Sequence, residues 1–261
     1  MFLLKKIFLC SIAIISLSIT AIAQTEAINK KDAKGLKQGK WTKTWENGKI
    51  KYTGQFVNDV PVGIFYYYYD DGKTEAINVF DARIKGFVRN TFYHDNGNVL
   101  SRGNYINQLK DSVWNYFSFD DHLVAQETYI LGKATGVSKK FYLNGKLAEE
   151  TNMVNGMEDG NWRAYFPSGQ LKDEATYIKG EIEGKSTSYH ENGKEYCQGF
   201  YKHGVRIGTW LYFKPSGGLD HKSIYKNGVD ILAKPEPLPE ALPNQNIIQD
   251  EFNKQFNGGG E

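Results

Sequence analysis

The sequence predicts an all-β fold, an elongated antiparallel meander of about eight β-hairpin units of 24 residues each. Two observations predict it. Turn dipeptides that end in glycine recur at a fixed spacing, and the segments between them are rich in Tyr, Phe, Trp and Thr, which favour strands. The recurring turns are Asn47-Gly48, Asp71-Gly72, Asn96-Gly97, Asn144-Gly145, Ser168-Gly169, Asn192-Gly193 and Ser216-Gly217.

The count of eight comes from the spacing of these turn glycines. Successive ones lie 24 or 25 residues apart, except for one gap of 48 residues between Gly97 and Gly145. Asp120-Asp121-His122 lies in the middle of that gap, and we interpret it as a degenerate turn. Other positions keep the same phase, since the seventh residue before the turn is aromatic in five units and the fourth residue before it is aromatic in seven. The repeat therefore accounts for most of the aromatic and glycine content.

The same columns predict the loop and the strand register. A three-residue loop, with a type I turn and glycine in the left-handed conformation, pairs the fourth residue before the glycine with the second residue after it. We favour this loop because it sets the regular aromatic column opposite a column of aliphatic residues. Counting alternate residues then places these two columns, with the aromatic residues eight after the glycine, on one face. The second face would carry the candidate binding residues Trp41, Trp45, Phe65, Tyr69, Trp114, Trp162, Phe166 and Trp210.

The unit resembles a known repeat family. The stretch from Gly160 through Trp162, Tyr165, Gly169 and Leu171, followed by Tyr177 and Gly180, is similar to the bacterial MORN-repeat-variant unit, whose members are often labelled YwqK-like antitoxins. The resemblance covers about residues 35–231 and implies the architecture more specifically than it implies a function. Units three and four depart from the pattern, since unit three lacks the opening Gly and Trp and unit four lacks its turn glycine. We expect a bulge or a longer loop there.

Both ends of the chain lie outside the repeat. Residues 1–23 are predicted to be a cleavable signal peptide, because Lys5 and Lys6 precede an apolar run and an Ala21-Ile22-Ala23 cleavage signal. The apolar run is shorter than the roughly 20 residues that a membrane span needs. Residues 24–34 are predicted to be a polar, disordered linker, and residues 35–231 the array.

The segment 232–261 is rich in proline and cannot continue the sheet. Ile248, Phe252 and Phe256 are spaced four apart within it, which is compatible with a short amphipathic helix or with a frayed tail. After cleavage at Ala23 the chain has 30 basic and 30 acidic residues, because two of its 32 basic residues leave with the signal peptide. A neutral chain has no overall field that attracts nucleic acid. Cys197 is then the only cysteine, and we expect an inert strand residue.

No pattern for catalysis, a cofactor or a metal stands out. His94 and His190 are expected to face solvent next to their turns, and no histidine pair has metal-ligand spacing. The acidic pairs Asp70-Asp71, Asp120-Asp121 and Glu149-Glu150 are explained more simply by turns and solubility than by acid–base chemistry. No phosphate-binding glycine loop or nucleophile motif occurs. We therefore expect a protein that is not an enzyme and has no cofactor.

Four functions remain open at this level. The first is an exported scaffold, periplasmic, on the cell surface or secreted, that binds a protein or an envelope glycan or lipid. The second, implied by the resemblance, is neutralisation of a partner toxin. The third and fourth are a membrane-surface adaptor, for which a neutral chain gives weak attraction to anionic lipid, and a glycan hydrolase. The sequence favours the scaffold.

Overall fold

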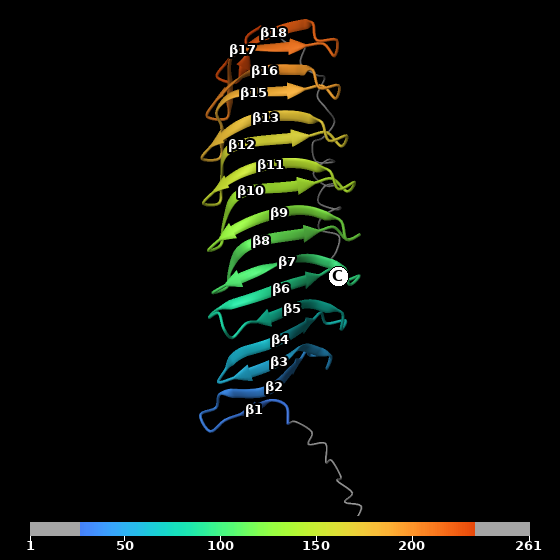
Figure 1. Ribbon diagram of the computed structural model, residues 1–261, viewed down its shortest axis with the longest axis vertical. Coiled ribbons are helices and arrows are strands. Elements are labelled where there is room, and N and C mark those ends of the chain that lie inside the picture. The colour runs from blue at the N-terminus through green and yellow to red at the C-terminus, as the bar shows by residue number, and fades with distance from the viewer. Residues whose placement is uncertain (1–26, 233–261) are drawn as a thin grey trace, which may run out of the picture.

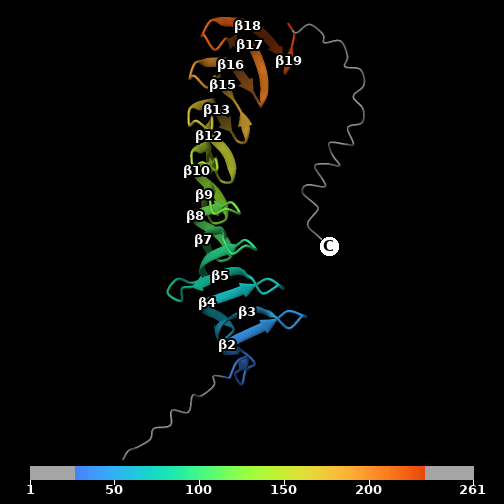
Figure 2. The same ribbon diagram turned by 90° about the vertical axis from the view of Figure 1, so that its right-hand side faces the viewer.

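The computed structural model describes residues 27–232 and places its strands in one antiparallel sheet. The predicted signal peptide and the amphipathic pattern beyond residue 232 lie outside the described residues. Within residues 27–232 there is no helix, and each strand pairs with its neighbours along the chain (Figure 1). Figure 2 shows the same hairpins stacked along one axis. The predicted all-β meander of repeated hairpins is confirmed.

Eight hairpins form the sheet, with a two-residue strand at each end. The end strands are β1 (Lys30–Lys31) and β19 (Val229–Asp230). The hairpins are β2 (Lys37–Thr44) with β3 (Ile50–Val57), β4 (Val60–Tyr68) with β5 (Thr74–Phe80), β6 (Phe87–Tyr93) with β7 (Val99–Ile106), β8 (Leu109–Phe117) with β9 (Leu123–Ile130), β10 (Lys133–Phe141) with β11 (Leu147–Val154), β12 (Met157–Tyr165) with β13 (Leu171–Ile178), β14 (Glu181–Ile182) and β15 (Gly184–Tyr189) with β16 (Glu195–Lys202), and β17 (Val205–Phe213) with β18 (Leu219–Lys226).

The loop inside each hairpin is the predicted three-residue loop. In the first unit the Gly48 N–H donates to the Trp45 carbonyl, the Trp45 N–H donates to the Lys49 carbonyl, and Thr44 pairs with Ile50. Gly48 has a φ of 82°, the left-handed conformation that glycine adopts without strain. The degenerate fourth turn keeps this loop, with Asp121 at a φ of 63° in the place of glycine. The irregularity expected at that turn is therefore wrong, because aspartate tolerates the left-handed region.

A second bulge next to this loop overturns the predicted assignment of faces. Beyond the Thr44–Ile50 pair, Lys43 pairs with Tyr52, so the returning strand contains one extra residue. The same shift recurs in all eight hairpins. One extra residue reverses the alternation of side chains. The aromatic residues eight after the glycine therefore share a face with the tryptophans, and the ring centroids of Trp41 and Phe56 are 6.0 Å apart.

The core consists of rings that lie over glycines of the preceding unit. Each such ring is the seventh residue before its turn glycine, and the glycine beneath it is the sixth residue after the previous turn glycine. A Cβ built on Gly54, Gly103 or Gly199 would lie 2.2 to 2.4 Å from the ring of the next unit. The three rings are Phe65, Trp114 and Trp210, and only 1%, 1% and 2% of their surfaces are exposed. The missing side chain is what allows each ring to reach the backbone.

The strand that brings each ring into place is bulged at a glycine. Between the first two units, Thr53 pairs with Tyr66 and Gln55 with Val62, so three residues lie opposite Gly54. Gly63 is one of the three and has a φ of 69°. Units one, two and five to eight have glycine at this position, nine before the turn glycine. In unit four Ser112 takes it, with a φ of 60°.

Side chains at the hairpin loops connect successive units. The Asn144 side chain accepts the Lys146 N–H within its own turn and donates through Nδ2 to the carbonyl of Pro167 in the next unit, 3.0 Å away. Asn47, Asn96 and Asn192 make the same link. The third residue before the glycine adds another, such as the 2.7 Å bond from the Tyr142 hydroxyl to the Tyr165 carbonyl. These bonds link successive units both where a ring lies over glycine and where it does not.

The array begins earlier than predicted. β1 pairs with β2, with Lys30 opposite Gln38, inside the stretch expected to be a disordered linker. The reason is local, because the Asp32 carboxylate accepts the backbone N–H groups of Lys34 and Leu36 and closes a turn that returns the chain to the sheet. Hydrogen bonds from these two N–H groups also hold the pKa of Asp32 below its ordinary value.

The glycine beneath each ring should be intolerant of any side chain. We expect Gly103→Ala to lower the free energy of unfolding by about 1–3 kcal/mol, because the new methyl group would overlap the Trp114 ring. Gly218→Ala is the matched control, since a Cβ at Gly218 meets nothing within 4 Å. Chemical denaturation monitored by tryptophan fluorescence measures both. Equal stability of the two variants would contradict the packing described above.

At the bulge position, glycine should be more stabilising than a residue with a side chain. Ser112→Gly should raise the free energy of unfolding by about 1 kcal/mol, because it removes the strain of a left-handed residue with a side chain. Gly136→Ser should lower it by a similar amount, since Gly136 has a φ of 70° and open space around its Cβ position. Thermal unfolding of both variants checks the pair, and a shift of the same sign in both would argue against backbone strain as the cause.

Candidate binding sites

The predicted tryptophan face is only partly exposed. Phe65, Trp114 and Trp210 are buried in the core described above, and the remaining candidates are half-buried: Trp41, Trp45, Tyr69, Trp162 and Phe166. Two of these serve the links between units, since Trp45 Nε1 and the Tyr69 hydroxyl each donate to a carbonyl of the following unit. The second bulge places rings from both strands of a hairpin on one face, which explains this burial. A binding role for the five half-buried residues stays a prediction.

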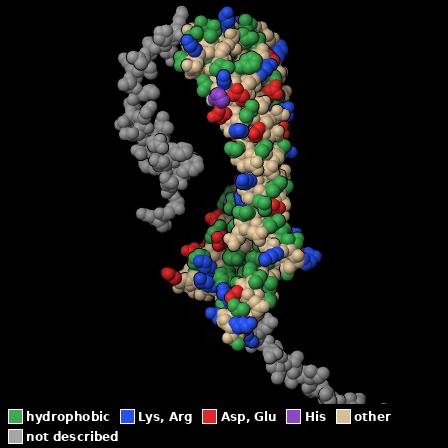
Figure 3. Space-filling view, turned by 90° about the vertical axis from the view of Figure 1, so that its left-hand side faces the viewer, with side chains coloured by type: hydrophobic (Ala, Val, Ile, Leu, Met, Phe, Trp, Pro, Cys, Tyr) green, Lys and Arg blue, Asp and Glu red, His purple; other side chains and the backbone are tan. Residues whose placement is uncertain are grey.

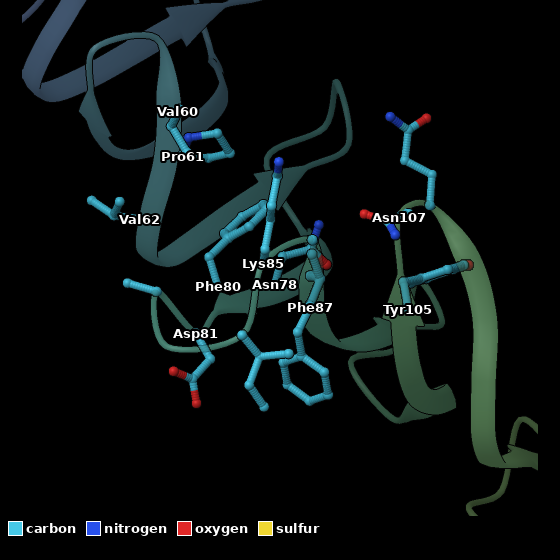
Figure 4. A pocket seen from close by; sticks show the side chains of 15 residues that line it. Val60, Pro61, Val62, Asn78, Phe80, Asp81, Lys85, Phe87, Tyr105 and Asn107 are labelled. Carbon is cyan, nitrogen blue, oxygen red and sulfur yellow. The ribbon is translucent and has the colours of Figure 1, made fainter. Parts of the chain in front are cut away.

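One recess lies where unit three breaks the repeat. This junction pocket has a volume of about 780 Å³. The start of β4, the end of β5, the following loop and the start of β6 line it, with Tyr105 and the turn at Asn107 and Gln108 on its other side (Figure 4). Its apolar lining comprises Val60, Pro61, Val62, Phe80, Ala82, Ile84, Phe87, Val88 and Tyr105.

The pocket exists because unit three lacks the residues that build the standard step between units. Val88 stands in the place of the bulge glycine, and Asn90 in the place of the ring. β5 and β6 therefore pair without a bulge, with Asn78 opposite Asn90. A straight strand uses fewer residues than a bulged one, so the surplus forms the loop Asp81–Gly86 instead of the two-residue turn used elsewhere. The longer loop expected in unit three is confirmed.

The loop is held in one shape by its own contacts. The Asp81 carboxylate accepts the Arg83 backbone N–H and pairs with the Arg83 guanidinium at 2.7 Å, which lowers the pKa of Asp81 to about 2. Gly86, with a φ of 75°, offers its carbonyl to the Asn107 N–H at 2.9 Å. A Cβ on Gly86 would overlap the Asn107 side chain. The wall of the junction pocket is therefore preorganised.

A polar pair lies beside the apolar lining. Asn90 Nδ2 donates to Oδ1 of Asn78, which lines the pocket. Asn90 is only 2% exposed, and its Oδ1 has no hydrogen-bond partner among the described residues. A buried carbonyl oxygen without a partner costs free energy. At this junction a hydrogen-bonded pair of asparagines therefore stands where other junctions have an aromatic ring packed on glycine.

A second surface runs along the edge that carries the two-residue turns. Val57, Val60, Leu109, Ile130, Val154, Met157, Ile178, Val205 and Val229 flank these turns and form what we call the aliphatic edge row. Each is between 38% and 65% exposed. At least one of them lies at each of the seven two-residue turns. Figure 3 views this edge and shows hydrophobic side chains recurring along it.

Comparison with known proteins identifies the repeat. The MORN repeat variant family matches residues 37–58, 89–107, 134–155, 158–179 and 182–203. Each matched segment falls on the hairpins of the sheet. The chain is a MORN-repeat-variant protein. No curated protein matches it.

Solved structures resemble the array only in part. A crystal structure of TarM has 21% identity and a TM-score of 0.28, and the match covers 37% of this chain and 19% of that one. A mutant of S. aureus TarM in complex with Fondaparinux, alpha-GlcNAc-glycerol and UDP matches to the same extent. The Photorhabdus luminescens Tc holotoxin pore has 9% identity and a TM-score of 0.18 over 70% of this chain and 11% of that one. Likenesses of this size do not define a shared fold.

The polar residues singled out in the sequence have structural contacts in the MORN-repeat-variant array. His94 and His190 are half-buried rather than solvent-facing, and Nε2 of each lies within 3.1 Å of a carbonyl oxygen of the next unit. Glu149 and Glu150 are engaged separately, Glu149 by Lys140 at 2.9 Å and Glu150 by the Tyr165 hydroxyl at 2.8 Å. In residues 27–232 no group of three or more His, Cys, Asp or Glu side chains is placed to hold a metal ion.

Cys197 lies in β16 and is 3% exposed. Burial is the main cause that raises the pKa of its thiol. A buried thiol with a raised pKa is a poor nucleophile, which agrees with the inert strand residue predicted. Among the described residues, no helix has the length and apolar character needed to cross a membrane.

Proposed function

We propose that this MORN-repeat-variant protein is an exported, non-catalytic scaffold that binds a partner protein along the aliphatic edge row. MORN repeats generally serve as binding or scaffold units, which supports the coarser part of the proposal. The observation that carries the finer part is the recurrence of exposed aliphatic residues at every two-residue turn of the array. Exposed aliphatic side chains that recur along one edge offer a protein partner a regularly spaced set of apolar contacts.

The turns themselves do not require this row. Ile130 pairs with Lys133, Ile178 with Glu181, and Val205 with Lys202, so charged residues fit the same edge positions. A two-residue turn gets its shape from backbone conformations with positive φ, such as those of Asn155 and Gly156. An apolar partner surface gives these aliphatic residues a role that the turn does not.

The columns that give the sequence its unusual composition have structural roles. Aromatic rings form the core, and glycines without a side chain leave room for three of these rings. Asparagines in the turns donate hydrogen bonds that link successive units. The proposal therefore assigns no residue a catalytic role. Toxin neutralisation, implied only by the resemblance to proteins with an antitoxin label, stays a prediction.

Charge in the middle of the row should abolish partner binding. We expect the double variant Val154→Glu, Met157→Glu to capture at least tenfold less partner protein from an envelope fraction than the unaltered chain does. The reason is that the new carboxylates would have to be desolvated in the interface. Val137→Glu is the matched control, an exposed valine outside the row. Quantitative mass spectrometry of the captured proteins, with thermal unfolding to show that all variants fold, is the measurement. Equal capture by the row variant and the control would refute the proposed surface.

Export has its own test. The basic start, the apolar run and the Ala21-Ile22-Ala23 signal support cleavage by a signal peptidase. We expect the protein isolated from its native cells to begin at Gln24 and to fractionate outside the cytoplasm. N-terminal peptide mapping after fractionation measures this, with an Ala21→Asp, Ala23→Asp variant as the uncleaved control. An intact Met1 on a cytoplasmic protein would exclude export.

A further inference from the structure

We infer that the junction pocket binds one single-chain anionic amphiphile, such as a medium-chain or long-chain carboxylate. The inference goes beyond the proposed scaffold function and does not depend on it. The pocket lies at the junction of units two and three and shares only Val60 with the aliphatic edge row, whereas the part of the row that the capture experiment alters lies at units five and six. Each site can therefore fail while the other stands.

The apolar part of such a ligand fits the lining. Nine of the fifteen lining residues are aliphatic or aromatic, and Phe80, Phe87 and Tyr105 supply rings. The volume of about 780 Å³ lies within the range of roughly 300–1,000 Å³ that small-molecule sites occupy. The loop Asp81–Gly86 is fixed by its internal ion pair and by its bond to Asn107, so little ordering is needed on binding.

The charge at the pocket selects an anion. Two charged residues line it, Asp81 and Lys85. The Asp81 carboxylate is already paired with Arg83 at 2.7 Å. Lys85 makes no ion pair within residues 27–232, and Figure 4 shows it among the side chains that line the recess. An ammonium group beside an apolar cavity is complementary to a ligand with an apolar chain and one negative head group.

The pocket is also not a by-product of the repeat. At three of the junctions between units a ring over glycine fills the corresponding space, as Trp114 does above Gly103. Unit three replaces the ring with Asn90 and the short turn with a longer loop that supplies both Lys85 and Ile84. The same departure therefore opens the cavity and brings the cation to it.

Calorimetric titration of the full chain with decanoate, below its micelle-forming concentration, tests the inference. We expect one site per chain. Lys85→Met should weaken decanoate binding about five- to tenfold, as the loss of one charge-assisted contact implies, and should leave binding of decanol unchanged. Lys179→Met, which removes an exposed turn lysine far along the array, is the matched control and should have no effect.

A blocking variant separates the pocket from other apolar surfaces. Ala82→Trp places an indole at the exposed loop residue that lines the pocket, and it should abolish binding of both decanoate and decanol while thermal unfolding shows an intact fold. Absence of saturable binding, equal effects of Lys85→Met and Lys179→Met, or unaltered binding by Ala82→Trp would each overturn the inference.

Discussion

The core of the array rests on one kind of contact, made at three junctions, in which the ring of one unit lies against a glycine that has no side chain in the unit before it. A single-layer sheet has no second layer to bury its apolar residues. Here the sheet obtains a core by letting Phe65, Trp114 and Trp210 lie flat against the backbone at Gly54, Gly103 and Gly199. The bulge that precedes each ring makes this possible, because it allows three residues to face one. Ring, glycine and bulge therefore act together as one device for joining units.

Where the device is weaker, other interactions substitute for it. Unit six has Trp162 above Thr151 rather than above glycine, and the ring is only half-buried. Tyr142 and Asn144 donate to carbonyl groups of that unit, as the equivalent loop side chains do at other junctions. In repeat proteins stability is a sum of unit and interface contributions. The interfaces of this array are thus unequal, and the polar step at unit three is the one that opens into a pocket.

The two candidate sites follow from different parts of this construction. The aliphatic edge row belongs to the regular repeat, since every two-residue turn contributes to it, and it suits an elongated protein partner. The junction pocket belongs to the break in the repeat and suits one small ligand.

The sequence by itself determined the period, the number of units, the three-residue loop and the residue pair that closes it, because turn glycines and aromatic columns are local signals that repeat. It also predicted that unit three departs from the pattern. It did not determine which columns of side chains share a face of the sheet. The bulge next to each loop adds one residue to the returning strand, and no characteristic residue type marks it in the sequence. That single residue places Trp41 on the same face as Phe56. Only the tertiary structure could show that Gly54, Gly103 and Gly199 make room for rings of the next unit. The role of a glycine within a strand depends on which side chain packs against it, and the sequence does not show that contact. The pocket and the edge row likewise depend on contacts between units, which no single unit encodes.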